Sequence, residues 1–571
     1  MKRLGLLFGY LKAQRLLFAG VICFAVIAVG AKLAIPYFIG LSIDAIRSGN
    51  SDILGYILTI IGLLLFGAVA RFFFDYFLGK AGEGIVKAMR TSLYEKMLKA
   101  PICFFDSRKE GDLLLLFTND IDTIRTGIIS GGASLFEGLV QILATIGLMF
   151  YLNWLLALLV VGLTPLSLLV SRIISKANAK SFRAQNARLG ELSGIGNETI
   201  ANLETIQSYG IEGIRREKFA AKCEEVRKAQ FKAVFASTWI NPSSRLVNNL
   251  IYGTIVMVGC ALLLNEPSWI GPFTVGYLSS FLTYAYQYMT PFNEVADASG
   301  DILYAMSALG RFNEVMERED EKESGYEPLR PQLSLIEGKD IHFGYDENIP
   351  VLKGIDFSLR KGKITALVGT TGCGKTTLIN LLMRFYEPNS GAILADGNPI
   401  SSATRHELRS HFGMVLQQSV IFHGTLRDNI AFGVDHASQE DLDQATKEAK
   451  GYGLVSKLPQ GYDTPIESLS LSSGERQLIC LARVLLSAPE IVLLDEATSH
   501  IDLRTEKALS GGFDTLLKGK TAVVVAHRLS TILGADEILV MDQGKIVERG
   551  TFSELMENKG FFARLYESQF E

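Results

Sequence analysis

Cysteine and histidine are scarce in this sequence of 571 residues, and their placement excludes several kinds of chemistry. The six cysteines are dispersed and include no Cys-x-x-Cys pair, which argues against a disulfide framework or a zinc site. All seven histidines lie at or beyond His342. The first half of the chain therefore cannot use imidazole for proton relay or metal binding.

A block of basic residues is also lacking. The net charge is only −4, and Lys and Arg do not gather into the kind of cluster that binds a polyanion. We therefore expect no nucleic acid partner. The length exceeds what one hydrophobic core can organise, so at least two domains are expected.

Long apolar runs dominate the first half of the chain. They predict six membrane spans, preceded by an amphipathic helix over residues 4–15 that would lie at the cytoplasmic interface. The first run is longer than a signal-peptide core and lacks a convincing cleavage site, so we interpret it as a retained span. The predicted spans cover residues 16–43, 54–78, 127–152, 155–174, 246–264 and 275 to about 295.

The connections between these spans alternate in length, and the two long ones, 80–125 and 176–245, are rich in Lys and Arg. Such residues concentrate on the cytoplasmic side, which predicts that both termini are cytoplasmic. Residues 54–100 contain no proline, and a helix of that length would reach about 70 Å and project beyond the bilayer. Polar breaks at 106–111 and 209–219 predict turns, either docked on a cytoplasmic domain or solvated as hairpin tips.

Four charged residues fall at membrane depth, where ionisable groups are costly: Lys32, Arg71, Asp75 and Glu137. For Lys32 and Asp75 we favour snorkelling or an interhelical ion pair. Glu137 lies mid-span, where it either faces an aqueous cavity or does not. None of them identifies a substrate.

Residues 318–332 are charged, contain Gly325, Pro328 and Pro331, and lack apolar periodicity, which predicts a linker. Before it, residues 1–317 form the expected all-α transmembrane domain, which would be embedded in the lipid bilayer. After it, apolar strands alternate with helical stretches over residues 333–571. This alternation predicts an α/β nucleotide-binding domain.

One stretch of the second domain carries a specific motif. It matches GxxxxGK[ST] between a buried strand at 363–368 and a helix from residue 378 onward. Glycines allow a tight turn whose N–H groups converge on an anion at the helix N-terminus. Lys375 would reach the β- and γ-phosphates of a bound nucleotide, and the Thr376 hydroxyl would bind Mg²⁺. The residues expected to form the cradle are Gly369, Thr370, Thr371, Gly372, Cys373, Gly374, Lys375, Thr376 and Thr377.

A second motif is the apolar run 491–494 followed by Asp495 and Glu496. Two carboxylates at the end of a buried strand are costly without a cation. Asp495 is placed to hold Mg²⁺ through water, and Glu496 to polarise the attacking water. Either motif alone would indicate a P-loop nucleoside triphosphatase.

The sequence LSSGERQ at 471–477 resembles the LSGGQ signature of ATP-binding cassette (ABC) proteins, and the resemblance extends to most of the chain. It implies that Tyr345 stacks on adenine and that Gln417 links metal and water to the transmembrane domain. It further implies a D-loop at 499–502 and a switch histidine, His527, on the γ-phosphate. In the membrane half, residues 99–113 resemble the first intracellular loop of type IV, exporter-type half-transporters.

The resemblance also implies a dimer. Two cassettes would close head to tail around two ATP molecules, each signature helix presenting its N-terminus, with Ser472 and Gly474, to the opposite γ-phosphate. The turns at 106–111 and 209–219 would then be coupling helices that link cassette closure to alternating access.

Two departures from the family pattern affect this expectation. Ser473 and Glu475 replace the usual glycine and glutamine of the signature, and the preceding stretch 464–471 is short and lacks its glycine. The Glu475 carboxylate, near a site built for the γ-phosphate, should repel that phosphate. Because Glu496 is intact, we favour one subunit of an asymmetric heterodimer over a homodimer.

The function that the resemblance implies is ATP-driven transport, preferentially export of an amphipathic drug-like or lipid-like compound from a bacterial plasma membrane. Two alternatives remain open at this point. One is an exporter-shaped importer of siderophores or vitamins. The other is an ATP-gated channel or sensor that does not pump.

Overall fold

The computed structural model describes residues 2–49, 53–108, 110–238, 240–265, 273–321, 329–330, 332–346, 348–416, 419–495, 503–526 and 529–570. Its internal contacts divide the chain into two compact units. The helical unit contains residues 1–98 and 110–318, and the α/β unit contains residues 99–109 and 319–571. A short segment from the first half of the sequence thus belongs to the α/β unit.

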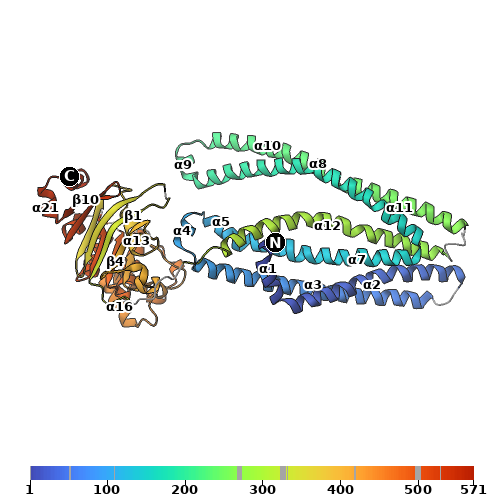
Figure 1. Ribbon diagram of the computed structural model, residues 1–571, viewed down its shortest axis with the longest axis horizontal. Coiled ribbons are helices and arrows are strands. Elements are labelled where there is room, and N and C mark those ends of the chain that lie inside the picture. The colour runs from blue at the N-terminus through green and yellow to red at the C-terminus, as the bar shows by residue number, and fades with distance from the viewer. Residues whose placement is uncertain are drawn as a thin grey trace. The chain divides into compact units, whose positions relative to one another are not determined.

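Long helices make up the helical unit (Figure 1). Two π-helical segments, η1 (Leu116–Asp120) and η2 (Arg125–Ser130), interrupt the helix that runs from α5 to α7. The α-helices are α1 (Lys2–Ala13), α2 (Arg15–Ser48), α3 (Ile53–Leu98), α5 (Glu110–Leu115), α6 (Ile121–Ile124), α7 (Gly131–Leu152), α8 (Trp154–Ala201), α9 (Leu203–Ser208), α10 (Glu212–Thr238), α11 (Ile240–Asn265) and α12 (Val275–Met316).

Five of the six predicted spans fall within a single α-helix, and the span 127–152 begins in η2 and continues through α7. Among the described residues, three segments are long and apolar enough to cross a membrane: Arg15–Ser48, Ile53–Leu98 and Gly111–Leu152. Trp154–Pro165 and Asn249–Asn265 are shorter apolar stretches. The expected extension of the second span is confirmed, because α3 continues for 46 residues.

The polar breaks are shorter than the sequence predicts. Asp106 is the last residue of α4 (Ile102–Asp106), and α5 begins at Glu110. The predicted turn over 209–219 is wrong in its second half, because α10 begins at Glu212. Ion pairs stabilise this polar helix, and Arg215 Nη2 lies 2.9 Å from Glu198 Oε1 of α8. A helix whose stability comes from charge pairs shows no apolar periodicity to identify it.

Most of the charged groups at membrane depth are paired. Arg71 of α3 makes two 2.8 Å hydrogen bonds to the Glu137 carboxylate of α7, and its Nε lies 3.2 Å from Asp75. Lys32 of α2 instead donates to the neutral amide oxygen of Gln141 at 3.0 Å. The interhelical ion pair at this depth joins Arg71 to Glu137. Neither residue for which the sequence predicts such a pair takes part in it, because Lys32 bonds to an amide and Asp75 pairs with Arg71 within α3.

Gln141 also donates to a carbonyl oxygen in another helix that a proline leaves without its usual donor. Its Nε2 donates to the carbonyl oxygen of Gln287 at 2.7 Å. Pro291, four residues further along α12, has no N–H, so this carbonyl lacks its ordinary intrahelical donor. The side chain of Gln141, which is only 4% exposed, thus ties α2, α7 and α12 together.

Two sheets form the α/β unit. One is the four-stranded sheet β2-β1-β4-β5, which is antiparallel. The other has the order β10-β9-β3-β8-β7-β6, and only β10 runs antiparallel to its neighbour. The strands are β1 (Leu335–Phe343), β2 (Leu352–Arg360), β3 (Ile364–Gly369), β4 (Ser390–Ala395), β5 (Asn398–Pro399), β6 (Phe412–Val415), β7 (Ile491–Asp495), β8 (Thr521–Val525), β9 (Glu537–Asp542) and β10 (Lys545–Gly550).

Helices surround these sheets (Figure 1). They are α13 (Lys375–Leu382), α14 (Arg405–Ser410), α15 (Leu426–Ile430), α16 (Gln439–Glu448), α17 (Tyr452–Val455), α18 (Ser473–Ser487), α19 (Leu503–Leu517), α20 (Leu529–Leu533), α21 (Phe552–Glu557) and α22 (Phe561–Phe570), with 3₁₀ turns η3 (Ile400–Ser402), η4 (Gly461–Asp463) and η5 (Ile466–Ser468). In the parallel sheet, Val525 of β8 lies opposite Leu367 of β3 and Asp495 of β7. The carboxyl ends of β3 and β7, with β8 between them, therefore lie at the same edge of the sheet.

Candidate nucleotide-binding site

The loop between β3 and α13 has the strand, turn and helix context that the motif requires. Gly372 and Gly374 adopt φ angles of 80° and 106°, which side chains disfavour. Gly374 is also the N-cap of α13, and a Cβ there would lie 2.5 Å from Leu352 Cδ2. The backbone conformation therefore favours glycine at position 374, and an added Cβ would also have to displace the Leu352 side chain.

The Lys375 side chain folds back over this loop. Its ammonium donates to the carbonyl oxygens of Gly369 at 2.8 Å and Thr370 at 2.9 Å. The residue is 7% exposed, so its charge is held inside the loop where phosphate oxygens can replace these carbonyls as acceptors. Cys373 is 3% exposed, and burial raises the pKa of its thiol despite the nearby Lys375.

Thr376 and Asp495 converge from two elements, with Thr376 Oγ1 lying 3.3 Å from Asp495 Oδ2. Hydroxyl and carboxylate oxygens suit Mg²⁺, which typically takes one or two carboxylates and completes its shell with phosphate and water. Among the described residues, no group of three His, Cys, Asp or Glu side chains could hold a metal ion alone. The donor set therefore fits a metal that arrives with a phosphate ligand.

Tyr345 approaches the same loop from the end of β1. Its hydroxyl lies 3.3 Å from Thr377 Oγ1 and accepts from Asn380 Nδ2 at 3.2 Å. Its ring is 53% exposed, which leaves a surface on which a base can stack. Gln417, Glu496 and His527, for which the sequence predicts catalytic or metal-binding roles, lie outside the described residues.

The first turn of α18 contains the predicted signature. Ser472 is its N-cap, and Gly474 is buried in the first turn. Sequence reasoning missed the role of Glu475, whose carboxylate accepts from the Ser472 N–H at 2.9 Å while the Ser472 hydroxyl accepts from the Glu475 N–H at 3.2 Å. The spacing Ser-x-x-Glu is the sequence signal for this capping box.

The structure thus groups the cradle residues 369–377 with Asp495 and Tyr345. It does not group them with the signature. Within the described part of the chain, no hydrogen bond or ion pair joins residues 369–377 to the first turn of α18. Each group of residues carries only part of the predicted ATP site.

Comparison with known protein families gives two matches that cover separate parts of the chain. Residues 17–292 match the model of the ABC transporter transmembrane region, and residues 352–499 match the ABC transporter model. An uncharacterised ABC transporter ATP-binding protein of Bacillus subtilis is 34% identical over 99% of this chain and 94% of its own length. The chain belongs to the ABC transporter family.

Two further relatives carry functional names. A fatty acid ABC transporter ATP-binding/permease protein of Mycobacterium bovis is 35% identical over 84% of this chain and 75% of its own length. An ATP-dependent lipid A-core flippase of Saccharophagus degradans is 31% identical over 90% of this chain and 86% of its own length.

Several predictions from the sequence are confirmed by the fold and these matches. This ABC transporter has a helical transmembrane domain followed by an α/β P-loop domain. It is an integral membrane protein that binds ATP and couples ATP hydrolysis to transport, and its relatives support export as the general activity.

Proposed function

We propose that this ABC transporter exports an amphipathic, lipid-like compound as one subunit of an asymmetric heterodimer. The names of two relatives, a fatty acid transporter and a lipid A-core flippase, support a lipid-like substrate. The Lys- and Arg-rich long loops support cytoplasmic termini and a cytoplasmic ATP-binding domain in a bacterial plasma membrane.

In the proposed ATP site, residues 369–377 hold the phosphates and Tyr345 stacks on adenine. Thr376, Asp495 and Gln417 hold Mg²⁺, which would neutralise developing charge on the phosphates. Glu496 polarises the attacking water, and His527 contacts the γ-phosphate. Ser472 and Gly474 of one chain face the ATP that is held by the other chain.

The capping box of α18 carries the asymmetry. Glu475 is an acceptor for the Ser472 N–H and places a negative charge at the positive end of the helix. A γ-phosphate approaching this turn would meet the negative charge of the Glu475 carboxylate beside the N–H donors of the helix end. The chain's own signature is therefore suited to the weaker site, while its cradle and Glu496 serve the hydrolytic site with a partner's signature.

Affinity purification tests this proposal. A tagged copy of the chain, extracted from the membranes of its own organism, should bring down an untagged second ABC half-transporter in equal amount. Mass spectrometry of the intact complex gives the stoichiometry. Recovery of a complex that contains only this chain would contradict the heterodimer and leave the family assignment unchanged.

A further inference from the structure

The segment of residues 99–108, hereafter the 99–108 segment, is held by the α/β unit at two points. The Tyr386 hydroxyl donates to the Asp106 carboxylate. Near the start of the segment, the Lys99 carbonyl accepts from the backbone N–H of Glu321 at 2.7 Å. Burial and the adjacent Asp106 raise the pKa of Tyr386, so its hydroxyl stays protonated and can donate.

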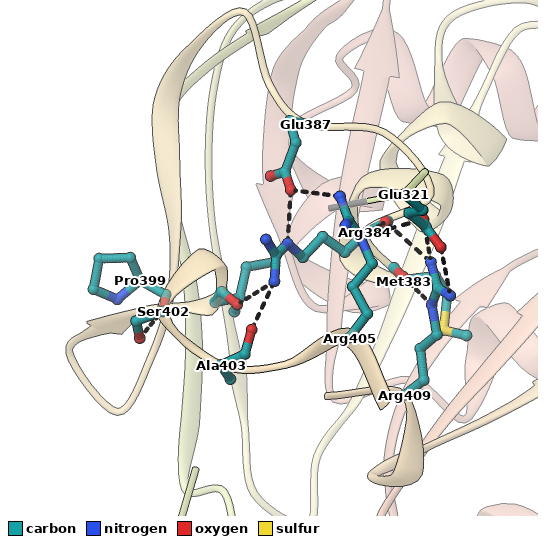
Figure 2. A network of polar contacts seen from close by, with 10 residues as sticks. Glu321, Met383, Arg384, Glu387, Pro399, Ser402, Ala403, Arg405 and Arg409 are labelled. Atoms are coloured by element: carbon teal, nitrogen blue, oxygen red, sulfur yellow. Dashed lines mark hydrogen bonds and ion pairs between the residues drawn. The ribbon is translucent and has the colours of Figure 1, made fainter. Parts of the chain in front are cut away.

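Tyr386 lies in the turn 383–387, which directly follows α13. Figure 2 shows the polar contacts that Arg384 and Glu387 of this turn make. The Arg384 side chain is only 1% exposed. Its Nε lies 2.7 Å from Glu387 Oε1, and its Nη1 donates to the Ala403 carbonyl at 2.8 Å. A buried guanidinium with these partners restrains the backbone on both sides of Tyr386.

Figure 2 also shows that the same turn is tied to Glu321. Arg409 donates to the Met383 carbonyl at 3.1 Å and pairs with Glu321 Oε1 at 3.0 Å. Arg405 bridges Glu321 and Glu387, at 3.2 Å from each carboxylate. The backbone N–H of Glu321 also donates to the Lys99 carbonyl. The 99–108 segment is therefore connected, at Lys99 and at Asp106, to the turn 383–387 that follows the phosphate-binding helix α13.

The ring of Tyr386 packs against two aromatic rings, those of Tyr345 and Phe343. It packs edge-to-face against Tyr345, with centroids 5.0 Å apart and planes at 90°. Phe343 completes the cluster, 5.0 Å from the Tyr345 centroid and 5.5 Å from the Tyr386 centroid. One side chain thus contacts the proposed adenine-stacking residue with its ring and the 99–108 segment with its hydroxyl.

We propose that Tyr386 is a positioning residue that transmits the arrival of the adenine base from Tyr345 to Asp106. The inference rests on the proposed role of Tyr345. A base stacked on Tyr345 adds a contact to one face of that ring and changes its edge-to-face packing with Tyr386. Because Arg384 holds the backbone of the turn, the Tyr386 side chain absorbs the change, and its hydroxyl moves Asp106.

Hydrogen exchange of the full-length chain, in lipid nanodiscs and with Glu496→Gln to block hydrolysis, tests the relay. Peptides that cover residues 99–108 should exchange differently with and without MgATP. Tyr386→Phe keeps the ring and removes the hydroxyl, so the ATP-dependent difference should disappear while ATP affinity stays within about 2-fold. Asp106→Asn should reproduce this loss with Tyr386 intact.

Tyr462→Phe is the matched control, because it removes a buried hydroxyl that donates to the Leu442 carbonyl at 3.2 Å in the same unit. It should leave the ATP-dependent difference intact. An undiminished difference in both Tyr386→Phe and Asp106→Asn would overturn the relay. So would a loss of ATP affinity in Tyr386→Phe as large as that in Tyr345→Ala, because Tyr386 would then act only in binding.

Tyr345→Ala separates the relay from the proposed ATP site. This variant should bind a fluorescent ATP analogue more weakly. Unchanged binding would contradict the role of Tyr345 and the relay together. Weaker binding in Tyr345→Ala, combined with a preserved exchange response in Tyr386→Phe and Asp106→Asn, would overturn the relay alone.

Discussion

Ser472 and Glu475 cap the first turn of α18 reciprocally, with N–H to oxygen distances of 2.9 and 3.2 Å. The arrangement fixes a carboxylate where ABC transporters of the consensus type have a neutral glutamine. A glutamine side chain can close the same box, since capping boxes accept either residue. The charge at this position can therefore be removed without removing the cap.

Glu475→Gln should raise ATP hydrolysis by the chain expressed alone. Removing a negative charge from a helix N-terminus restores about 1 kcal/mol of attraction for the γ-phosphate, or about 5-fold in rate. Steady-state phosphate release measures it. Glu554→Gln is the matched control, because Glu554 forms an equivalent box with Thr551 in α21, and it should leave the rate unchanged. Equal rates for Glu475→Gln and wild type would contradict this role of the carboxylate.

Lys375→Ala and Glu496→Gln should separate binding from hydrolysis. Lys375 supplies the ammonium at the centre of the cradle, so its loss should abolish binding of a fluorescent ATP analogue. Glu496→Gln should bind the analogue as the wild type does and retain ATP without turnover. Equal loss of binding in the two variants would refute this division of roles.

Alkylation of Cys373 should be slow at neutral pH and blocked by MgATP. Because burial raises the pKa of the thiol, the thiolate fraction should grow only at a pH above that for an exposed cysteine. Mass spectrometry can follow N-ethylmaleimide labelling at Cys373 and at Cys103, which is exposed. Labelling of Cys373 as fast as Cys103, or a lack of protection by ATP, would mean that the cradle is folded differently.

Gln141→Leu should destabilise the helical unit. It leaves the Lys32 ammonium and the Gln287 carbonyl without their described partner, at a cost of about 1–3 kcal/mol. Thermal unfolding in nanodiscs gives the midpoint. Thr145→Val is the control, because it removes a hydrogen bond to the Gln141 carbonyl within the same helix and should lower the midpoint less. Equal shifts would show that Gln141 does not join the helices.

Local patterns predicted the elements that local physics determines. The cradle could be identified from residues 369–377 because its glycines, its lysine and the flanking strand and helix are contiguous. The Glu475 cap was also present in the sequence as Ser-x-x-Glu, although only its charge was interpreted. The start of α10 was missed because its charged residues stabilise the helix through partners on α8, which no local pattern shows.

Contacts between distant residues lay beyond the sequence. Asp106 and Tyr386 are separated by 280 positions, and Gln141 and Gln287 by 146. Each pair depends on how whole elements pack together. Neither aspartate nor tyrosine carries a pattern that names the other as its partner. The sequence offered docking on a cytoplasmic domain as one of two alternatives for residues 106–111, and only the folded chain places residues 99–109 in the α/β unit.

The most direct test of the asymmetric exporter is steady-state ATP hydrolysis by the purified complex with Glu496→Gln in this chain and a wild-type partner. If this chain's Glu496 serves the hydrolytic site, the rate should fall about 100-fold or more, since a positioned base contributes at least that much. Retention of about half the wild-type rate would show two equivalent hydrolytic sites and would contradict the asymmetric exporter.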